Sequence, residues 1–225
     1  MKSEESQAQL SLRLRDLLLK QVTLIGAPQV LCALIPLAKA EGDPAAKATS
    51  STLSEKWNSV DVPSIRVRGG AAIDSIYGNL LNKIFQSFGS HARDIEFMEL
   101  WNVYGIYLSD FSVLTALETE LMVFVTIMCT GLRGPSLWHM RGMGRLLGAR
   151  GTNESTPEMG RIKDMLRNIK VAAMSVVEWC GPEFVRRSGM ESEIGWVNVG
   201  DVTRDLGGWG DDEFPATGRR TTMSE

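Results

Sequence analysis

The stretch Leu117–Gly148 contains a strongly apolar run and is interrupted once by a corner that is rich in Gly and Pro. Every residue of Leu121–Cys129 except Thr126 is apolar, which is typical of a helix buried on all sides. That run is too short to cross a bilayer, because a spanning helix needs about 20 apolar residues. The pattern predicts two buried helices, one over Leu117–Thr130 and one running from the corner to Gly148.

Apolar positions elsewhere recur at three- and four-residue spacing, which predicts further helices. Pro36 falls inside one of them, and we expect that helix to kink or end there because proline lacks an amide proton. Residues 57–68 alternate only weakly and are predicted to be irregular, and Gly69 and Gly70 are expected to open the central helical block. No segment shows convincing strand alternation, so the predicted fold class is all-α. The remaining helices are expected over residues 1–26, 28–40, 71–88, 92–107 and 156–180, with a helical turn over 183–188.

These elements divide the chain into four predicted parts. They are an N-terminal helix pair (1–42), a linker or irregular segment (43–69), a helical core (70–189) and a Gly/Asp-rich tail (190–225). The tail is expected to be poorly packed, with Trp196 and Trp209 as its only large anchors. The N-terminal pair faintly echoes the central stretch, since Asp16 and Glu120 each precede an apolar helix and a Gly/Pro corner. Either the pair is a degenerate half-repeat, or any two antiparallel helices look alike.

Composition narrows the class of protein. The 225 residues are 44% hydrophobic, enough for one sizeable core or two small ones. A net charge of -3 and a pI of about 5.6 do not suggest a nucleic-acid binder. The N-terminus lacks the apolar core of a signal peptide, and no run reaches membrane-spanning length. We therefore expect a cytoplasmic protein without nucleic-acid or membrane partners.

Three widely separated cysteines, Cys32, Cys129 and Cys180, argue against a disulfide framework. Their apolar neighbours predict buried thiols. The two histidines, His91 and His139, also lie far apart in the sequence, so a histidine metal site is not expected.

The best candidate chemistry is a carboxylate and an imidazole in the central stretch. Glu120 lies near the start of the first buried helix and His139 near the start of the second. Histidine exchanges protons near neutral pH. A helix N-terminus would lower the pKa of His139, and apolar neighbours would raise the pKa of Glu120. Both residues also have structural interpretations, and Glu118 could take the place of Glu120.

Several short motifs follow one another between Gly70 and Lys170. They are Ile76-Tyr77-Gly78, Tyr104-Gly105, Glu120-Leu121, His139, Arg141-Gly142 and Thr156-Pro157-Glu158. In this order and spacing, about half of the chain resembles the carboxymuconolactone decarboxylase and alkylhydroperoxidase D-like (AhpD-like) superfamily. The resemblance implies an AhpD-like helical bundle and a homo-oligomer, either a trimer or hexamer or a dimer, with sites lined by more than one subunit.

The decarboxylase branch of that superfamily is the nearer one. Glu120 and His139 are nineteen residues apart, as in the peroxidase branch, but Leu132 and Pro135 occupy the positions of the two peroxidase cysteines. Peroxidase chemistry needs a thiolate of low pKa and a resolving thiol. Neither is present at these positions.

The resemblance implies a cofactor-free decarboxylase, or a related lyase or isomerase of secondary metabolism, that acts on a small, cyclic carboxylic acid. No metal or cofactor is needed if the substrate contains its own electron sink. Two other functions stay open: a non-catalytic ligand-binding or scaffold oligomer, and a thiol-dependent alkylhydroperoxidase, which the missing cysteines disfavour. In the enzyme hypothesis His139 donates the proton, Glu120 orients it, Arg133 and Arg141 bind the carboxylate, and Trp101, Tyr104 and Trp138 form the wall of the ligand site.

Overall fold

The computed structural model describes residues 4–42 and 61–210, and the all-α class is confirmed because these ranges contain no strand. Most of the predicted linker and the last fifteen residues of the predicted tail lie outside the described residues. The helices are α1 (Glu4–Ile25), α2 (Ala27–Ala40), α5 (Val62–Tyr77), α6 (Leu80–Ser87), α7 (Ala92–Phe97), the π-helix η2 (Met98–Leu108), α8 (Ala116–Cys129), α9 (Arg133–Leu146), α10 (Pro157–Trp179), α11 (Pro182–Arg187) and α12 (Val199–Leu206). Short 3-10 turns, η1 (Gly89–His91) and η3 (Met190–Ser192), complete the set.

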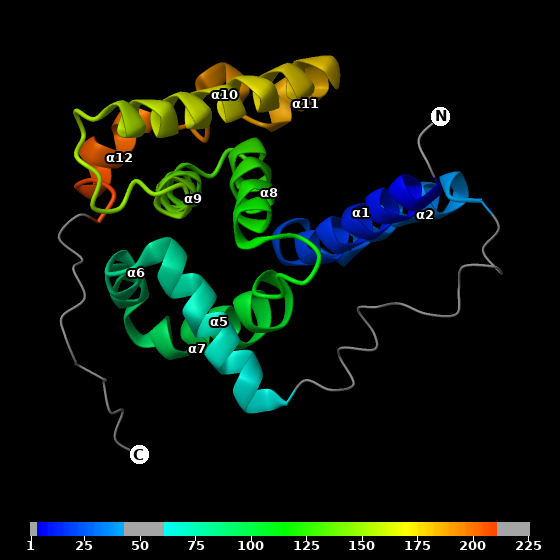
Figure 1. Cartoon of the computed structure of the whole chain (residues 1–225), viewed down its shortest axis with the longest axis horizontal. Coiled ribbons are helices and arrows are strands. Elements are labelled where there is room, and N and C mark those ends of the chain that lie inside the picture. The colour runs from blue at the N-terminus through cyan, green and yellow to red at the C-terminus, as the bar shows by residue number, and fades with distance from the viewer. Residues whose placement is uncertain (1–3, 43–60, 211–225) are drawn as a thin grey trace.

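Helix α8 lies at the centre of the molecule, with α10 along one side of the α8–α9 pair and α5, α6 and α7 on the other (Figure 1). Phe124 and Met128 of α8 pack into a core shared with α9, α10 and the C-terminal segment. Val123 and Ile127 face a second core, shared with α5, α6 and η2. Helix α8 is therefore buried from two opposite directions, which agrees with its all-round apolar sequence.

The two ends of α8 follow from local sequence. Thr115 and Glu118 form a capping box, in which the Glu118 amide donates to Thr115 Oγ1 and the Thr115 amide donates to Glu118 Oε2. At the other end Gly131 adopts a left-handed conformation (φ 74°), which starts the corner into α9. Glu118 is thus used in the exposed cap, and Glu120 is the glutamate buried inside the fold.

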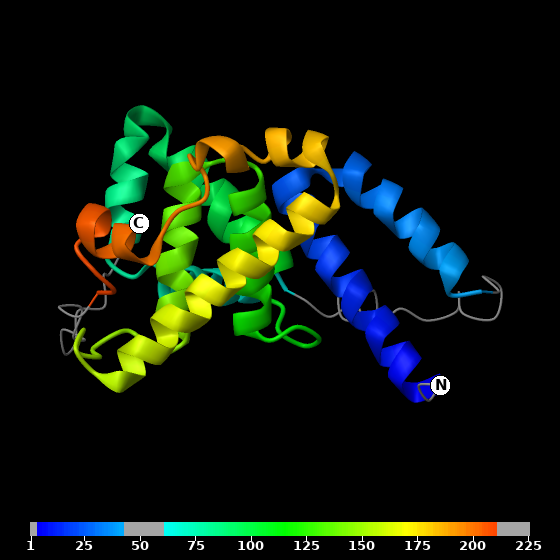
Figure 2. The same ribbon diagram turned by 90° about the horizontal axis from the view of Figure 1, so that it is seen from above.

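The N-terminal helices α1 and α2 form a hairpin beside this core (Figure 2), and they match the predicted ranges closely. Helix α2 was expected either to kink or to end at Pro36. It does not end there but continues to Ala40. Cys32, whose carbonyl loses its helical partner because of Pro36, is exposed. Water can solvate an exposed carbonyl, so the missing hydrogen bond costs little here.

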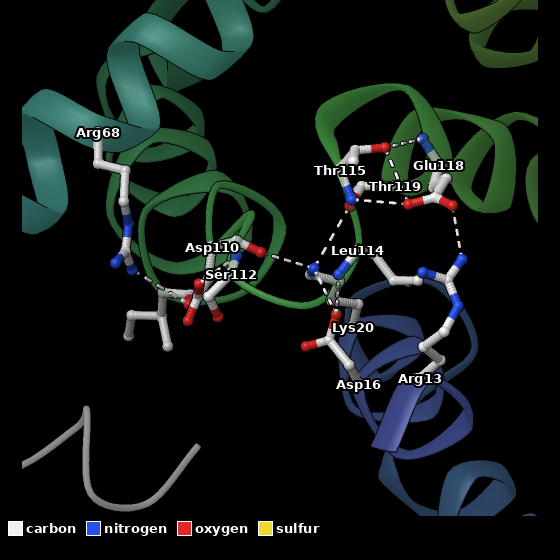
Figure 3. A network of polar contacts seen from close by, with 11 residues as sticks. Arg13, Asp16, Lys20, Arg68, Asp110, Ser112, Leu114, Thr115, Glu118 and Thr119 are labelled. Atoms are coloured by element: carbon white, nitrogen blue, oxygen red, sulfur yellow. Dashed lines mark hydrogen bonds and ion pairs between the residues drawn. The ribbon is translucent and has the colours of Figure 1, made fainter. Parts of the chain in front are cut away.

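A buried ion pair holds α1 against α8 (Figure 3). The Lys20 ammonium donates to Asp16 Oδ2 at 2.7 Å, to the Asp110 carbonyl at 2.7 Å and to Thr119 Oγ1 at 3.3 Å. The Leu114 amide donates to the same Asp16 oxygen at 3.3 Å. The pair therefore joins the N-terminal hairpin to the loop that leads into α8.

The prediction that residues 57–68 are irregular is wrong from Val62 onward, where α5 begins. Asp61 caps this helix by accepting from the Ser64 amide at 2.8 Å, and Pro63 occupies its first turn. Gly69 lies inside α5 instead of opening a helix, because η2 crosses there: a Cβ on Gly69 would lie 2.3 Å from the Leu100 carbonyl oxygen. The single helix predicted over 71–88 is divided at Gly78, which has a φ of 51°.

The prediction of a poorly packed tail is wrong for residues 190–210. Trp196 and Trp209 are almost completely buried, and Val202 of α12 packs in the same core. The Trp209 ring lies directly over Gly144 of α9, where a Cβ would approach it to 2.1 Å. Glycine in α9 thus leaves a groove that an aromatic ring fills, a long-range fit that helical periodicity does not reveal.

The prediction of three buried thiols is also wrong, because Cys32 and Cys180 are exposed and Cys129 is half-buried. No helix in the described part of the chain is both long enough and apolar enough to cross a bilayer.

Candidate functional site

A chain of hydrogen bonds connects three helices beside η2. His139 of α9 lies with Nδ1 2.8 Å from Glu120 Oε1 of α8, and both side chains are buried. The Tyr77 hydroxyl at the end of α5 lies 2.9 Å from His139 Nε2. Tyr104 of η2 donates to the Tyr77 hydroxyl at 3.4 Å. The acid and the imidazole proposed from sequence are therefore in direct contact.

Glycine at position 142 makes room for this contact. A Cβ there would lie 2.6 Å from Glu120 Oε1 and 2.5 Å from Ile76 Cγ2. His139 lies in the second turn of α9, which begins at Arg133, and not at the first position.

The pKa values of the surrounding groups follow from burial. Burial raises the pKa of Glu120, and the neighbouring His139 partly offsets that increase. Burial also raises the pKa of Tyr77 and Tyr104, so that both phenols keep their protons at neutral pH. With two protonated phenols and a neutral imidazole that carries its proton on Nδ1, hydrogen-bond donation runs from Tyr104 to Tyr77, then to His139 Nε2, and from His139 Nδ1 to Glu120.

The chain of hydrogen bonds ends at a cavity of about 250 Å³. His139 and Tyr77 line it, and the exposed side chains of Phe88 and Met98 lie at its rim. Pockets for drug-sized ligands hold roughly 300–1,000 Å³, so this one suits a smaller molecule. No lysine or arginine is found among the described residues that line it. Most of its wall is aliphatic, including Ile73, Leu81, Ile84, Val103, Val123 and Ile127.

The structure brings together four of the seven site residues proposed from sequence. Tyr104, Trp138 and His139 line the cavity, and Glu120 lies directly behind His139. Trp101 lies apart from them: its ring is 6.0 Å from that of Phe97, beside a separate surface depression.

Neither proposed carboxylate-binding arginine lines the cavity. Arg133 is exposed and forms ion pairs with Asp205 at 2.7 Å and Asp201 at 3.5 Å. Arg141 is buried and donates to the carbonyls of Tyr77 at 2.8 Å and Gly208 at 2.9 Å. Successive helical residues turn by about 100°, so a side chain two positions after His139 points away from the cavity. Arg141 instead fixes the end of α5, where Tyr77 lies.

Two titratable residues of the cavity wall, Tyr77 and Glu99, are not assigned a role by the sequence. Tyr77 precedes the helix-ending Gly78. It belongs to the Ile76-Tyr77-Gly78 motif, which by itself predicts no chemical role for the phenol. Glu99 lies in the π-helix η2, five residues before Tyr104. A helix of α periodicity was expected there, and that spacing does not place residues 99 and 104 on one side. π-Helical turns are often found at functional sites.

No group of three His, Cys, Asp or Glu side chains that could hold a metal ion occurs within residues 4–42 and 61–210. Comparisons with protein-family models, with curated proteins and with solved structures found no match for this chain.

Proposed function

We propose that this chain is a cofactor-free lyase of the decarboxylase type, or a related isomerase, that moves protons on a small apolar carboxylic acid. The supporting observation is the buried chain Glu120–His139–Tyr77 that ends at an apolar cavity. This arrangement suits general acid–base catalysis, because an imidazole oriented by a carboxylate lies within reach of a site for the reacting atom. Membership of the superfamily that the sequence resembles is part of the proposal.

The reaction needs one proton for each molecule of CO2 released. In the loaded state His139 carries protons on both nitrogens, with Nδ1–H donating to Glu120 and Nε2–H donating to the Tyr77 oxygen. The bond between the carboxyl carbon and its neighbour breaks, and its electron pair stays on that neighbouring carbon. Tyr77 gives its proton to the carbon and takes one from His139 Nε2. The imidazole ends neutral and regains its proton from solvent.

Tyr77 thus stands between His139 and the substrate, which modifies the role of direct donor that the sequence suggested for His139. The raised pKa of Tyr77 disfavours a free phenolate. Proton transfer from His139 to Tyr77 must therefore accompany transfer from Tyr77 to carbon.

The apolar wall assists the same step. A carboxylate loses its charge as CO2 leaves, so surroundings that solvate the ion poorly favour the transition state over the bound substrate. A cavity without a neighbouring lysine or arginine has this property.

The other functions carry less support. A thiol peroxidase needs a reactive thiolate, but burial raises the pKa of Cys129 to about 11, and Cys129 does not line the cavity. A non-catalytic ligand-binding or scaffold protein differs from the proposed enzyme only in lacking turnover.

We also propose that the protein is cytoplasmic and that copies of it associate into a homo-oligomer. Leu31 and Ile35 on α2 are exposed although that helix is strongly apolar, which fits an interface between subunits. Light scattering on the purified chain would test this part separately.

The test is turnover of a panel of small cyclic and unsaturated keto and lactone acids in D2O, followed by CO2 release and by deuterium incorporation at carbon. His139→Gln should reduce turnover by about 10²–10⁴-fold, the usual contribution of general acid–base catalysis. His91→Gln is the matched control, because His91 is exposed and lies outside the cavity. Unchanged turnover in His139→Gln contradicts the proposal, and binding without turnover of any panel member favours the ligand-binding alternative.

A further inference from the structure

A second carboxyl group, Glu99, lines the cavity that contains His139 and Tyr77. Within the described residues its side chain makes no hydrogen bond or ion pair, although it is partly buried. Partial burial makes the anion of a carboxyl without a partner less favourable, because fewer water molecules and no cation compensate its charge. An acid in such a place either keeps its proton or receives a partner from a ligand.

The groups around Glu99 do not supply the missing partner. Among described residues, the titratable groups that face it are His139 of α9, Tyr77 of α5, Tyr104 of η2 itself, and Glu120 of α8 behind the imidazole. Helices α1, α6 and α7 contribute only uncharged side chains to the cavity wall. Burial raises the pKa of Glu99, and the charge of His139 only partly offsets this effect.

We propose that Glu99 stays protonated in the resting site and donates a hydrogen bond to the carbonyl oxygen of the substrate, which makes the substrate class a small apolar 3-oxo acid. An acid of this class carries a ketone two carbons from its carboxyl carbon. When the C–C bond to the carboxyl group breaks, its electron pair forms the enolate double bond, and the negative charge moves to the ketone oxygen. Glu99 stabilises that oxygen without giving up its proton, while Tyr77 protonates the carbon.

Glu99 and Glu120 have different roles because their surroundings differ. Glu120 is paired with His139, whereas the Glu99 carboxyl makes no hydrogen bond or ion pair within the described residues. A carboxylic acid kept neutral by an apolar site is an effective donor to an oxyanion that develops in the transition state. The inference rests on the proposed function for the reaction, but the state of Glu99 can be tested without turnover.

The probe is 2,4-dinitrophenolate, an enolate mimic that stays anionic over the range used, with the uncharged methyl ether 2,4-dinitroanisole as the matched neutral probe. Binding is followed by quenching of tryptophan fluorescence, since Trp138 lines the cavity. Between about pH 5 and pH 8, phenolate affinity for the wild-type chain should fall about tenfold per pH unit once the pH exceeds the pKa of Glu99. The neutral ether should bind without a pH slope.

Glu99→Gln keeps a donor of the same shape that does not titrate, so it should bind the phenolate with no pH slope. Glu99→Ala removes the donor and should weaken phenolate binding at the acid end of the range by roughly tenfold or more. A slope that persists in Glu99→Gln and disappears in His139→Gln would assign the proton to the imidazole and overturn the inference. A wild-type affinity that is independent of pH and no tighter than that of Glu99→Ala would overturn it as well. Failure of the proposed function, by contrast, would appear as unchanged turnover in His139→Gln with the phenolate slope intact.

Discussion

Within residues 4–42 and 61–210, two acid–base pairs have both side chains buried, and they differ in how their remaining polar atoms are satisfied. In the pair Asp16–Lys20, each of the three ammonium protons has an acceptor, and the Leu114 amide also donates to Asp16 (Figure 3). In the pair Glu120–His139, the second imidazole nitrogen leads through Tyr77 to a cavity.

The difference separates a structural role from a chemical one. A pair whose ammonium protons all have acceptors in the protein fixes helices in place and has no proton left for another molecule. A pair whose outer nitrogen contacts a cavity residue can pass a proton to whatever enters. Burial and pairing alone therefore do not identify a functional site, whereas the connection to an empty volume does.

The largest effect on stability is expected at the Asp16–Lys20 pair. Lys20→Ala leaves Asp16 buried without its cation, and removing one partner of a buried pair typically costs about 3–5 kcal/mol. Urea denaturation measures the change, with Lys39→Ala on exposed α2 as the control, which should stay within about 0.5 kcal/mol of wild type. A loss below about 1 kcal/mol for Lys20→Ala would show that the pair does not hold α1 in place.

An intermediate effect is expected at Gly142. Gly142→Ala places a methyl group against the Glu120 carboxylate and Ile76, and overpacking of this kind costs about 1–3 kcal/mol. Because the carboxylate must move, the variant should also lose turnover in the D2O assay. Gly160→Ala is the control, since nothing lies within 4 Å of a Cβ there and alanine favours the α10 helix. Normal stability and turnover in Gly142→Ala would contradict the tight placement of Glu120.

The smallest effect is a change in how stability depends on pH. Burial raises the pKa of Glu99 above its usual value of 4.5, so folding favours the protonated form. Wild type should therefore lose stability as the pH rises from 4.5 through the folded-state pKa, because the native state must then ionise a desolvated acid. Glu99→Gln lacks this loss and should gain stability over wild type at pH 8 relative to pH 4. The exposed Glu178→Gln should follow the wild-type profile, and parallel profiles for all three proteins would contradict the assignment.

Local sequence signals predicted most of the fold. Periodicity and caps located α1, α8 and α10, and the corner at Gly131 joined α8 to α9 as expected. The errors came from contacts between distant residues. Gly69 looks like a helix break until η2 is seen to cross it, and the 190–210 segment looks loose until Trp209 is placed over Gly144.

The sequence predicted only part of the candidate site, because the rest also depends on how distant residues are arranged in the folded chain. The Glu120–His139 contact was expected from the order and spacing of the motifs. Arg133 and Arg141 lie close to His139 in the sequence, but their direction on α9 takes them away from the cavity. Glu99 was missed because its position depends on a π-helix, which a search for α-helical spacing does not detect.

The most direct test of a working proton chain is 15N NMR of the imidazole nitrogens. The chain contains two histidines, and His91→Gln assigns their signals. In the neutral form, His139 should carry its proton on Nδ1, donating to Glu120, with Nε2 accepting from Tyr77, and its shifts should respond when 2,4-dinitrophenolate enters the cavity. A neutral His139 protonated on Nε2, with signals that the phenolate leaves unchanged, would show an imidazole isolated from the cavity and would contradict the account.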